Sequence, residues 1–587
     1  MKQSTFHFIC SILAGCIALL LTIALNHLGL DVDLKSGSAF AIFASIVSYL
    51  IMSPNSLNKI KHYCNDYDWA EELVRFYQSI PSVYKKSFWI SFALINLAFL
   101  FHTINFMWGA YDWDAIRFSV DNLSAIKEGK FTAYTLQNLL FDGKILPVIN
   151  NLWAFIGLSF GGILLAYYWD LPKKTFIYTI ITLFLTITPY TLSWMYFAKN
   201  TLGNLWLPAF ITLGLILSQK ASNSINRSYF YNLLSISLFL LSFGTYLPVI
   251  NFLFVAIVGK MFLSIATSNL TFKDAAVRQL QTLANITASI LIYIFIILLL
   301  KQANQHSVTS ISFTNVIANI PLLLSSMVLQ LTTTVPFIDT SYKLITLGFI
   351  VLTLFIIIYK SSSIKSAITC LCLVPVLLIC SKLSLLLSSN INELNLVRVD
   401  FYGLPILYTL MLALTLKLET TYLKRFVYVV ACLVIFMSFV RISYALKVWK
   451  FGFDAELKLS ERIISRMEKM ENFNIERQYK LFQIGSQSLR HRYYLKKANE
   501  AKSNSLLDIA YYNQDNASSA YNFFYQSDFA SDNASLYELS QIPEIKDYIL
   551  NKARPWPHKE SIFIHNDHII FVLDENELYN TQKYLAN

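Results

Sequence analysis

Residues 426–440 read Phe-Val-Tyr-Val-Val-Ala-Cys-Leu-Val-Ile-Phe-Met-Ser-Phe-Val, and basic residues close this run at both ends. An apolar segment of about 20 residues is long enough to cross the hydrocarbon core of a bilayer as a helix. Such segments recur from Thr5 to Leu446, and we expect about 13 spans in all. Their predicted starts lie near residues 5, 37, 87, 146, 175, 202, 228, 246, 281, 341, 366, 400 and 425. The predicted fold is therefore an all-α polytopic membrane protein.

The composition agrees with a membrane location. Hydrophobic residues make up 55% of the chain and charged residues 14%, whereas soluble domains carry about a quarter charged residues. The net charge of +11 does not indicate a nucleic-acid partner, because the basic excess lies mostly in short loops. By the positive-inside rule, these loops share the cytoplasmic side if the N-terminus is cytoplasmic. They carry Lys59, Lys61, Arg75, Lys85, Lys86, Lys173, Lys174, Lys220, Arg227, Lys273, Arg278, Lys360, Lys365, Lys417, Lys424 and Arg425.

Two segments need interpretation before this topology holds. Thr5–Leu30 is long for a signal peptide and lacks a small-residue cleavage site, so we interpret it as a retained first span. Ser307–Phe337 is apolar but rich in Ser and Thr. Counting it as a span would place Lys360 and Lys365 on the wrong side, so we interpret it as an external loop with an interfacial or re-entrant piece.

The chain divides into a transmembrane domain, residues 1–450, and a small C-terminal module, residues 451–587, expected to be α+β and to lie outside the membrane. Apolar residues at helical spacing predict an amphipathic helix at Asp454–Glu471. Two β-rich runs, Ser561–His565 and His568–Leu573, are separated by Asn566-Asp567, which predicts a hairpin with a tight turn.

An acidic and aromatic cluster, Gly109-Ala-Tyr-Asp-Trp-Asp-Ala-Ile-Arg117, follows the third predicted span. Asp112 and Asp114 are candidates for a general base, or for binding a divalent cation such as Mg²⁺ or Mn²⁺. Asp114 has a structural alternative as a helix N-cap before a predicted helix at residues 115–128, which would end at Gly129 and lie flat on the bilayer. Tyr111 and Trp113 are either sugar-stacking groups or part of the aromatic belt at the membrane interface.

Several cations break the positive-inside trend by lying on or near the outer face. Such groups could hold the phosphate of a lipid-linked substrate, because Lys and Arg bind phosphate through charge-assisted hydrogen bonds. Arg398 has the alternative of pairing with Asp400 or of snorkelling, and Lys199 that of a surface lysine. Glu393 is a candidate contact for acceptor hydroxyls, or a solvated side chain. The outer cations are Arg117, Lys199, Lys301, Lys382 and Arg398.

His102 lies inside the third predicted span. A polar residue in a span is a functional candidate, but a core histidine is the favoured interpretation here. The chain contains no phosphate-binding loop, dinucleotide fingerprint, zinc-protease motif or nucleophile elbow, so it shows no sign of a cytoplasmic nucleotide enzyme.

Dispersed residues across most of the chain resemble the Gtr-type bacterial glucosyltransferases that modify O-antigen, which are similar to GT-C glycosyltransferases. The match is best between Tyr111 and Tyr246, and Tyr246-Leu247 stands where the family often has a Tyr-Gln pair. The residues that carry the resemblance are Asn105–Asp114, Glu128-Gly129-Lys130, Pro147 with Asn151, Leu158-Ser159 with Tyr168-Trp169, Pro189 with Ser193-Trp194, and Ser242–Tyr246.

The resemblance implies a GT-C-like enzyme of the bacterial inner membrane, with a periplasmic active site and a periplasmic C-terminal module. The implied donor is a sugar, typically glucose, on undecaprenyl phosphate, and the implied acceptor is O-antigen or a related lipopolysaccharide glycan. The catalytic acid would map onto Asp112 or Asp114. We expect Arg117, Lys199 and Arg398 to hold the lipid phosphate, and Tyr111, Trp113, Tyr246 and Glu393 to contact sugar or acceptor. The resemblance leaves open whether a divalent cation assists.

Other classes of protein remain open from sequence. A transporter or flippase of lipid-linked glycans would share the spans and outer cations, but should also show internal repeats and midplane charges. A ligase or polymerase of lipid-linked glycans would place Arg and His in one large late external loop, whereas Lys301–Asp339 contains His306 and no Arg. A non-catalytic scaffold gives no reason for the cluster around Asp112.

Overall fold

The computed structural model describes eight long stretches of the chain. These are residues 74–107, 129–195, 203–223, 227–303, 364–386, 400–417, 421–485 and 530–586, less residues 76, 142, 269 and 534, with a few isolated residues between 319 and 355. The predicted spans near residues 5, 37 and 341 and nearly all of Ser307–Phe337 lie outside the described residues.

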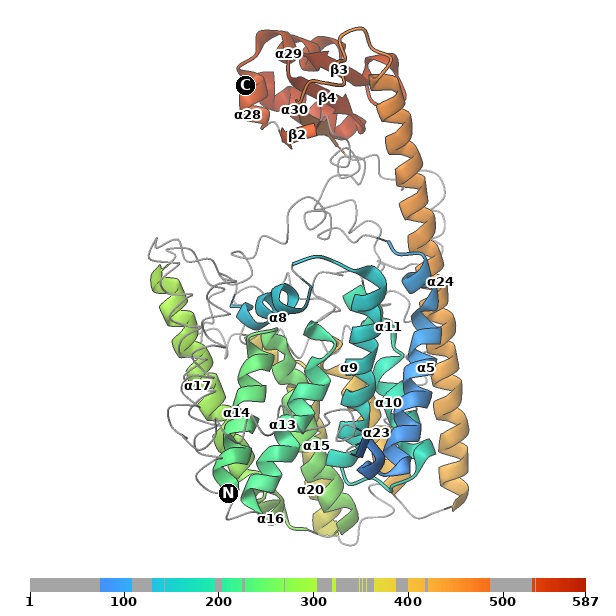
Figure 1. Ribbon diagram of the computed structural model, residues 1–587, viewed down its shortest axis with the longest axis vertical. Helices are drawn as coiled ribbons and strands as arrows, with labels where there is room; N and C mark the ends of the chain where they lie inside the picture. The colour runs from blue at the N-terminus through green and yellow to red at the C-terminus, as the bar shows by residue number, and fades with distance from the viewer. Residues whose placement is uncertain are drawn as a thin grey trace, which may run out of the picture.

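The transmembrane part is a bundle of antiparallel helices (Figure 1). Among the described residues, five helices are long and apolar enough to cross a membrane, and the number is six if a pair of helices bent by 60° just before Pro189 forms one span. The chain is therefore a membrane protein. The principal described helices of the bundle, including shorter ones, are α5 (Ser82–Ile104), α9 (Pro147–Tyr168), α10 (Thr175–Thr186) with α11 (Pro189–Met195), α13 (Leu207–Ser222), α14 (Ser228–Phe243), α15 (Ile250–Ser268), α17 (Leu280–Ala303), α20 (Ile364–Cys380), α23 (Leu404–Lys417) and α24 (Thr421–Met467).

The bundle has two chemically different ends. Successive helices alternate in direction, so the residues at the starts of α5, α10, α14, α17, α20 and α24 gather at one end, shown at the bottom of Figure 1. We call this the basic end, and the opposite one, towards the C-terminus, the tail-side end. The basic end carries Lys85, Lys86, Lys173, Lys174, Lys220, Arg227, Lys273, Arg278, Lys365, Lys417, Lys424 and Arg425, as the loop charges predict.

α9 packs closely against its neighbours because it presents glycines to them. A β-carbon at Gly157 would lie 2.6 Å from the indole ring of Trp206, and one at Gly162 would lie 2.6 Å from the backbone of Thr182 on α10. Small residues permit such approach where no hydrophobic effect drives helices together in lipid. Polar side chains add bonds elsewhere: Asn285 of α17 donates to Ser218 of α13 at 2.9 Å and to Asn232 of α14 at 2.9 Å.

α24 connects the bundle to the C-terminal module without a break (Figure 1). Its 47 residues span about 70 Å at the rise of an α-helix. The separate amphipathic helix expected at Asp454–Glu471 is instead the last part of α24, which ends at Met467. Ile463 and Met467 are fully buried against the sheet of the module, so the predicted apolar face is used for packing.

The module is built on a four-stranded sheet of order β2-β1-β4-β3. The strands are β1 (Tyr479–Ile484), β2 (Ala530–Asn533), β3 (Ile562–His565) and β4 (His568–Val572). The expected hairpin is present as the antiparallel pair β3–β4, and Asn566 takes the left-handed conformation, φ 52°, in its turn. One face of the sheet packs on α24, and the other on α29 (Pro543–Asp547) and α30 (Glu575–Ala586).

The Arg554–Pro557 segment fixes the module to α24. Trp556 is buried, with the Arg466 guanidinium 4.2 Å from the centre of its ring. Arg466 also donates to the carbonyls of Pro557 and His558 at 3.0 Å each. Trp556 therefore has a structural role in attaching the module to α24.

Candidate functional site

Most of the residues predicted to form the site lie outside the described part of the chain. These are Tyr111, Asp112, Trp113, Asp114, Arg117, Lys199, Glu393 and Arg398. The described residues that flank them nevertheless share one location. Met107 and Gly129, Met195 and Gly203, and Leu386 and Asp400 all lie at the tail-side end of the bundle. The three segments that carry the predicted residues thus leave from and return to the same end.

Tyr246, the remaining predicted residue, belongs to an aromatic triad at this end. Its ring centre lies 5.0 Å from that of Trp194, edge to face, and 5.8 Å from that of Tyr402. Trp194 and Tyr402 complete the triangle at 5.9 Å. The Tyr402 hydroxyl donates to the backbone carbonyl of Asn204 at 3.0 Å, which ties the start of α23 to the start of α13.

A buried ion pair lies at the same end. Lys382 follows α20, Asp400 precedes α23, and the ammonium of Lys382 donates to the Asp400 carboxylate. Their side chains are only 4% and 6% exposed. Lys382 is one of the predicted outer cations, and Arg398, the partner that the sequence offered for Asp400, lies outside the described residues. Because burying two charges is costly, the pair is expected to serve specificity or function rather than stability alone.

Close backbone approach holds the two halves of this ion pair together. A β-carbon at Gly403 would lie 1.8 Å from the carbonyl oxygen of Ser381, so only glycine fits there. Asn251 of α15 closes the other side. It donates to the Ser384 hydroxyl at 3.0 Å and accepts from the Ser384 amide at 2.7 Å. The turn 381–386 is therefore fixed from both sides.

A short helix, α8 (Phe131–Phe141), crosses the bundle at this end (Figure 1). The amide of Thr132 donates to the carbonyl of Gly244 at 2.9 Å, and a β-carbon at Gly244 would lie 2.4 Å from the Phe131 ring. Gly129, which precedes α8, has φ +77°, a left-handed conformation that glycine adopts without strain. The predicted interfacial helix at residues 115–128 lies outside the described residues.

A polar cluster at the basic end surrounds the C-terminus of α9. Asp170, at φ 52°, follows α9 in the left-handed conformation. The amide of Leu171 donates to the carbonyl of Ala166 at 3.1 Å and that of Asp170 to Tyr167 at 3.0 Å, the two bonds of a Schellman motif.

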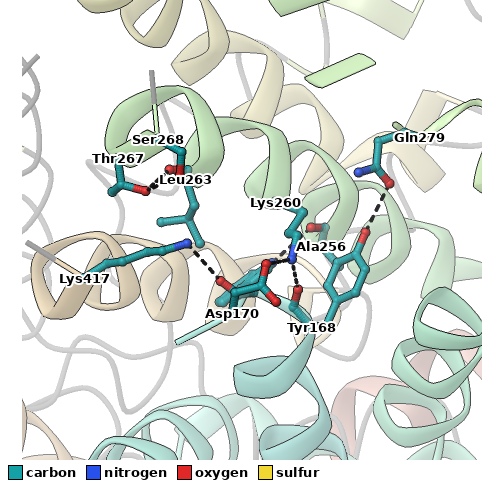
Figure 2. Close-up of polar contacts among 10 residues, drawn as sticks. Tyr168, Asp170, Ala256, Lys260, Leu263, Thr267, Ser268, Gln279 and Lys417 are labelled. Atoms are coloured by element: carbon teal, nitrogen blue, oxygen red, sulfur yellow. Dashed lines mark hydrogen bonds and ion pairs between the residues drawn. The ribbon is translucent and has the colours of Figure 1, made fainter. Parts of the chain in front are cut away.

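Two lysines satisfy the last carbonyls of α9, as Figure 2 shows. Lys260 of α15 donates to the carbonyl of Tyr168 and to the Asp170 carboxylate, and Lys417 of α23 donates to the carbonyl of Trp169 at 3.3 Å. Cations are favoured at a helix C-terminus because the carbonyls there carry partial negative charge. Each ammonium is thus used in holding α9, α15 and α23 together, and the cluster needs no ligand to explain it.

His102 has the core position that its sequence context favours. It is fully buried, its Nδ1 lies 3.2 Å from the Asn151 amide nitrogen, and its ring stacks on Trp449 at 5.2 Å. It thereby joins α5, α9 and α24. Within the described stretches, no three His, Cys, Asp or Glu side chains come together as a metal site. A divalent cation at Asp112 or Asp114 stays a prediction, because both lie outside those stretches.

Sequence reasoning missed Tyr402, Asn204, Asn251 and Ser384, and used Trp194 only as part of the family resemblance. A signal existed for Asn251, which is an amide inside an apolar span. Tyr402 and Ser384 carry no comparable signal, because aromatic residues and serines are ordinary in spans.

The fold and this end of the bundle define a polytopic membrane protein with a buried polar and aromatic site at one membrane face. A family model described as glucosyl transferase GtrII matches residues 106–399, about half of the chain. The chain belongs to this family of glucosyltransferases, which confirms the resemblance seen in the sequence. No curated protein and no solved structure matches it. Trp194, Tyr246 and Lys382 fall within the matched region, and Asp400 and Tyr402 follow it directly.

Proposed function

We propose that this glucosyltransferase moves glucose from undecaprenyl phosphate to O-antigen or a related lipopolysaccharide glycan at the periplasmic face of the bacterial inner membrane. The observation that carries the proposal is the gathering of the aromatic triad, the Lys382–Asp400 pair and the flanks of all three predicted segments at the tail-side end. The opposite end is the basic one, which by the positive-inside rule faces the cytoplasm.

The proposed chemistry is a displacement at the anomeric carbon of the donor. Asp112 or Asp114 takes the proton of an acceptor hydroxyl, whose oxygen attacks the anomeric carbon as the bond to the phosphate oxygen breaks. Arg117, Lys199 and Arg398 offset the charge that develops on the leaving polyprenyl phosphate. Tyr111, Trp113, Tyr246 and Glu393 orient sugar and acceptor. A divalent cation at the acidic pair would supply further charge stabilisation to the phosphate.

We assign Lys382 and Asp400 a positioning role. Both are buried and bound to each other, and they connect the turn 381–386 to the start of α23. The segment 387–399, which carries Glu393 and Arg398, begins and ends at these two anchored points. The ion pair therefore holds the ends of a substrate-binding segment in register.

The test is the glycan change on expression. The wild type, Asp112→Asn and Asp114→Asn would be expressed at matched membrane levels in a strain that supplies undecaprenyl-phosphate glucose, and surface polysaccharide compared by mass spectrometry. We expect an added hexose with the wild type that one of the two substitutions abolishes. A hexose that survives both would exclude the acidic pair as the base. No added hexose in a host with the native acceptor would favour the alternatives, a transporter or flippase, or a ligase or polymerase of lipid-linked glycans.

A further inference from the structure

The first turn of α9 carries a buried amide that the packing of the bundle does not use. Asn150 is 1% exposed, and in the described part of the chain neither its side-chain oxygen nor its side-chain nitrogen has a hydrogen-bond partner. It does not cap the helix either, because Leu146 occupies the N-cap position of α9. A buried amide with both atoms unbonded destabilises a fold, so this residue needs an explanation beyond packing.

The other asparagines of the described membrane-spanning helices all have partners. Asn151, the next residue of α9, has its amide nitrogen 3.2 Å from Nδ1 of His102 and donates to the Thr103 hydroxyl at 3.4 Å. Amides in these helices are thus buried by pairing them with a neighbour, and Asn150 is the exception. The paired asparagines are Asn96, Asn151, Asn232, Asn251 and Asn285.

Two further buried groups at the tail-side end keep one polar atom unbonded. Gln137 of α8 donates to the carbonyl of Lys144 at 2.7 Å, but its side-chain oxygen has no partner among the described residues. The same holds for Nε2 of His102 within the described stretches. At the basic end, by contrast, the amides of Gln279 and Gln281 both have partners. Unused amide and imidazole groups therefore gather at the end that holds the candidate site.

Asn150 lies on the face of α9 that meets the start of α13. It precedes Gly157 by seven residues, which places both on one side of a helix with a drift of about 20°. A β-carbon at Gly157 would lie 2.6 Å from the indole ring of Trp206. Two residues before Trp206, the carbonyl of Asn204 accepts from the Tyr402 hydroxyl of the aromatic triad. The unbonded amide therefore lies on the side of α9 that leads to the triad.

The chemistry of an amide suits a neutral ligand that carries hydroxyl groups. Its nitrogen donates and its oxygen accepts, so it can bind two neighbouring hydroxyls of a sugar at once. An ionised phosphate only accepts hydrogen bonds and is better matched by Lys or Arg. The acyl chain of a lipid offers no polar atom at all.

We propose that Asn150 binds the hydroxyls of a hexose through both atoms of its side-chain amide, with the side-chain oxygen of Gln137 as a further acceptor at this end. The identity of that hexose, as the glucose of the donor or a sugar of the acceptor glycan, rests on the proposed function. A site that hydrogen-bonds a substrate hydroxyl discriminates strongly against a ligand without it, because its buried polar groups are then left unpaired. Asn150 would thus give the site selectivity for a sugar-bearing ligand.

The test uses Asn150→Leu, which keeps the approximate size of the side chain and removes its hydrogen-bonding groups. Binding of undecaprenyl phosphate glucose and of undecaprenyl phosphate to the full chain in lipid nanodiscs would be compared by native mass spectrometry. We expect the affinity for the glucosylated lipid to fall about tenfold, as the loss of two ordinary hydrogen bonds predicts, and that for the sugar-free lipid to stay unchanged. If the hexose belongs to the acceptor, both lipids keep their affinity, and KM for the acceptor rises about tenfold instead.

Thermal unfolding adds a readout that separates binding from structure. Asn150→Leu should raise the thermal midpoint, because it removes an unbonded buried amide. The matched control, Asn285→Leu near the basic end, should lower the midpoint, because it breaks the bonds to Ser218 and Asn232, and should leave sugar binding as in the wild type. Unchanged lipid affinity and unchanged KM in Asn150→Leu would overturn the proposal, whichever way the midpoint moves.

The binding assay needs no turnover, so it is independent of the proposed function. Weaker binding of the glucosylated lipid to Asn150→Leu, together with no hexose transfer by the wild type in a host with the native acceptor, would refute the proposed function. The role of Asn150 in sugar binding would remain.

Discussion

At the scale of single residues, backbone strain and burial identify a position where an ion pair accounts for the residue type. Asp170 adopts a left-handed conformation that glycine takes at lower cost. Its carboxylate pairs with Lys260, whose side chain is 11% exposed, while that of Asp170 is 71% exposed. The ion pair with Lys260 explains why position 170 is an aspartate, because the backbone conformation alone would favour glycine.

Asp170→Asn should therefore destabilise the protein. It leaves the ammonium of Lys260 without its carboxylate, at a cost of about 1–2 kcal/mol once the exposure of Asp170 is considered. The double variant Asp170→Asn/Lys260→Met should recover part of this loss, because it also removes the buried charge. Thermal unfolding in detergent gives the comparison, with Asp170→Gly as a variant that also relieves the backbone. Additive losses in the double variant would contradict an interacting pair.

A second prediction at this scale concerns pH. The hydrogen bond from Lys480, at 2.6 Å, holds the pKa of Glu538 below its usual value. A lowered pKa in the folded state stabilises the module above the unfolded pKa of about 4.3, and this contribution is lost as pH falls through the folded value. The difference in thermal midpoint between wild type and Glu538→Gln should thus shrink as pH is lowered from about 5 to 3. A constant difference over that range would contradict this assignment.

At the scale of elements, close contacts between chain segments set the geometry of the site. The turn after α20 and the start of α23 meet at Gly403, and Lys382 and Asp400 pair beside this contact. These partners lie too far apart in the sequence for helix periodicity to predict that they meet. The packing of the helices brings them together.

Gly403→Ala should disrupt the site. Its β-carbon would meet the Ser381 carbonyl at 1.8 Å, so the backbone has to move and the ion pair with it. We expect hexose transfer to fall about tenfold or more at matched membrane levels. Gly348→Ala is the matched control, since a β-carbon at Gly348 meets nothing within 4 Å. Full activity in Gly403→Ala would show that the positioning role of this contact is wrong.

The ion pair itself gives a further prediction. Lys382→Met and Asp400→Asn should each lower the folded yield, because each removes one partner of a buried ion pair. The double variant should fold better than either single variant but transfer less hexose than wild type, because the ends of the segment 387–399 are no longer held. Size-exclusion profiles in detergent and glycan mass spectrometry measure the two effects. Wild-type transfer by the well-folded double variant would remove the pair from the mechanism.

At the scale of the whole molecule, α24 joins the bundle and the C-terminal module into one structure. The helix continues from the basic end through the bundle to the sheet, where Arg466 and Trp556 fix the module to it. The module is therefore held on the same side of the bundle as the candidate site.

The proposed orientation can be checked on this scale. In a background without native cysteines, Lys174→Cys at the basic end and Asn576→Cys in the module are both at exposed positions. A membrane-impermeant maleimide added to intact spheroplasts should label the second and not the first, because the positive-inside rule places the basic end in the cytoplasm. The reverse pattern would invert the proposed topology and remove the periplasmic site.

The sequence by itself determined the membrane class, the helices near residues 87, 146, 175, 202, 228, 246, 281, 366, 400 and 425, the gathering of basic residues at one end, the β3–β4 hairpin and the family. Hydropathy, loop charge and turn chemistry are local properties, so each can be read along the chain. Only the tertiary structure decided that Asp400 pairs with Lys382, that Tyr246 meets Trp194 and Tyr402, and that α24 has no break at residue 450. These depend on which helices touch, and in lipid that is set by small-residue contacts and buried polar bonds between distant segments.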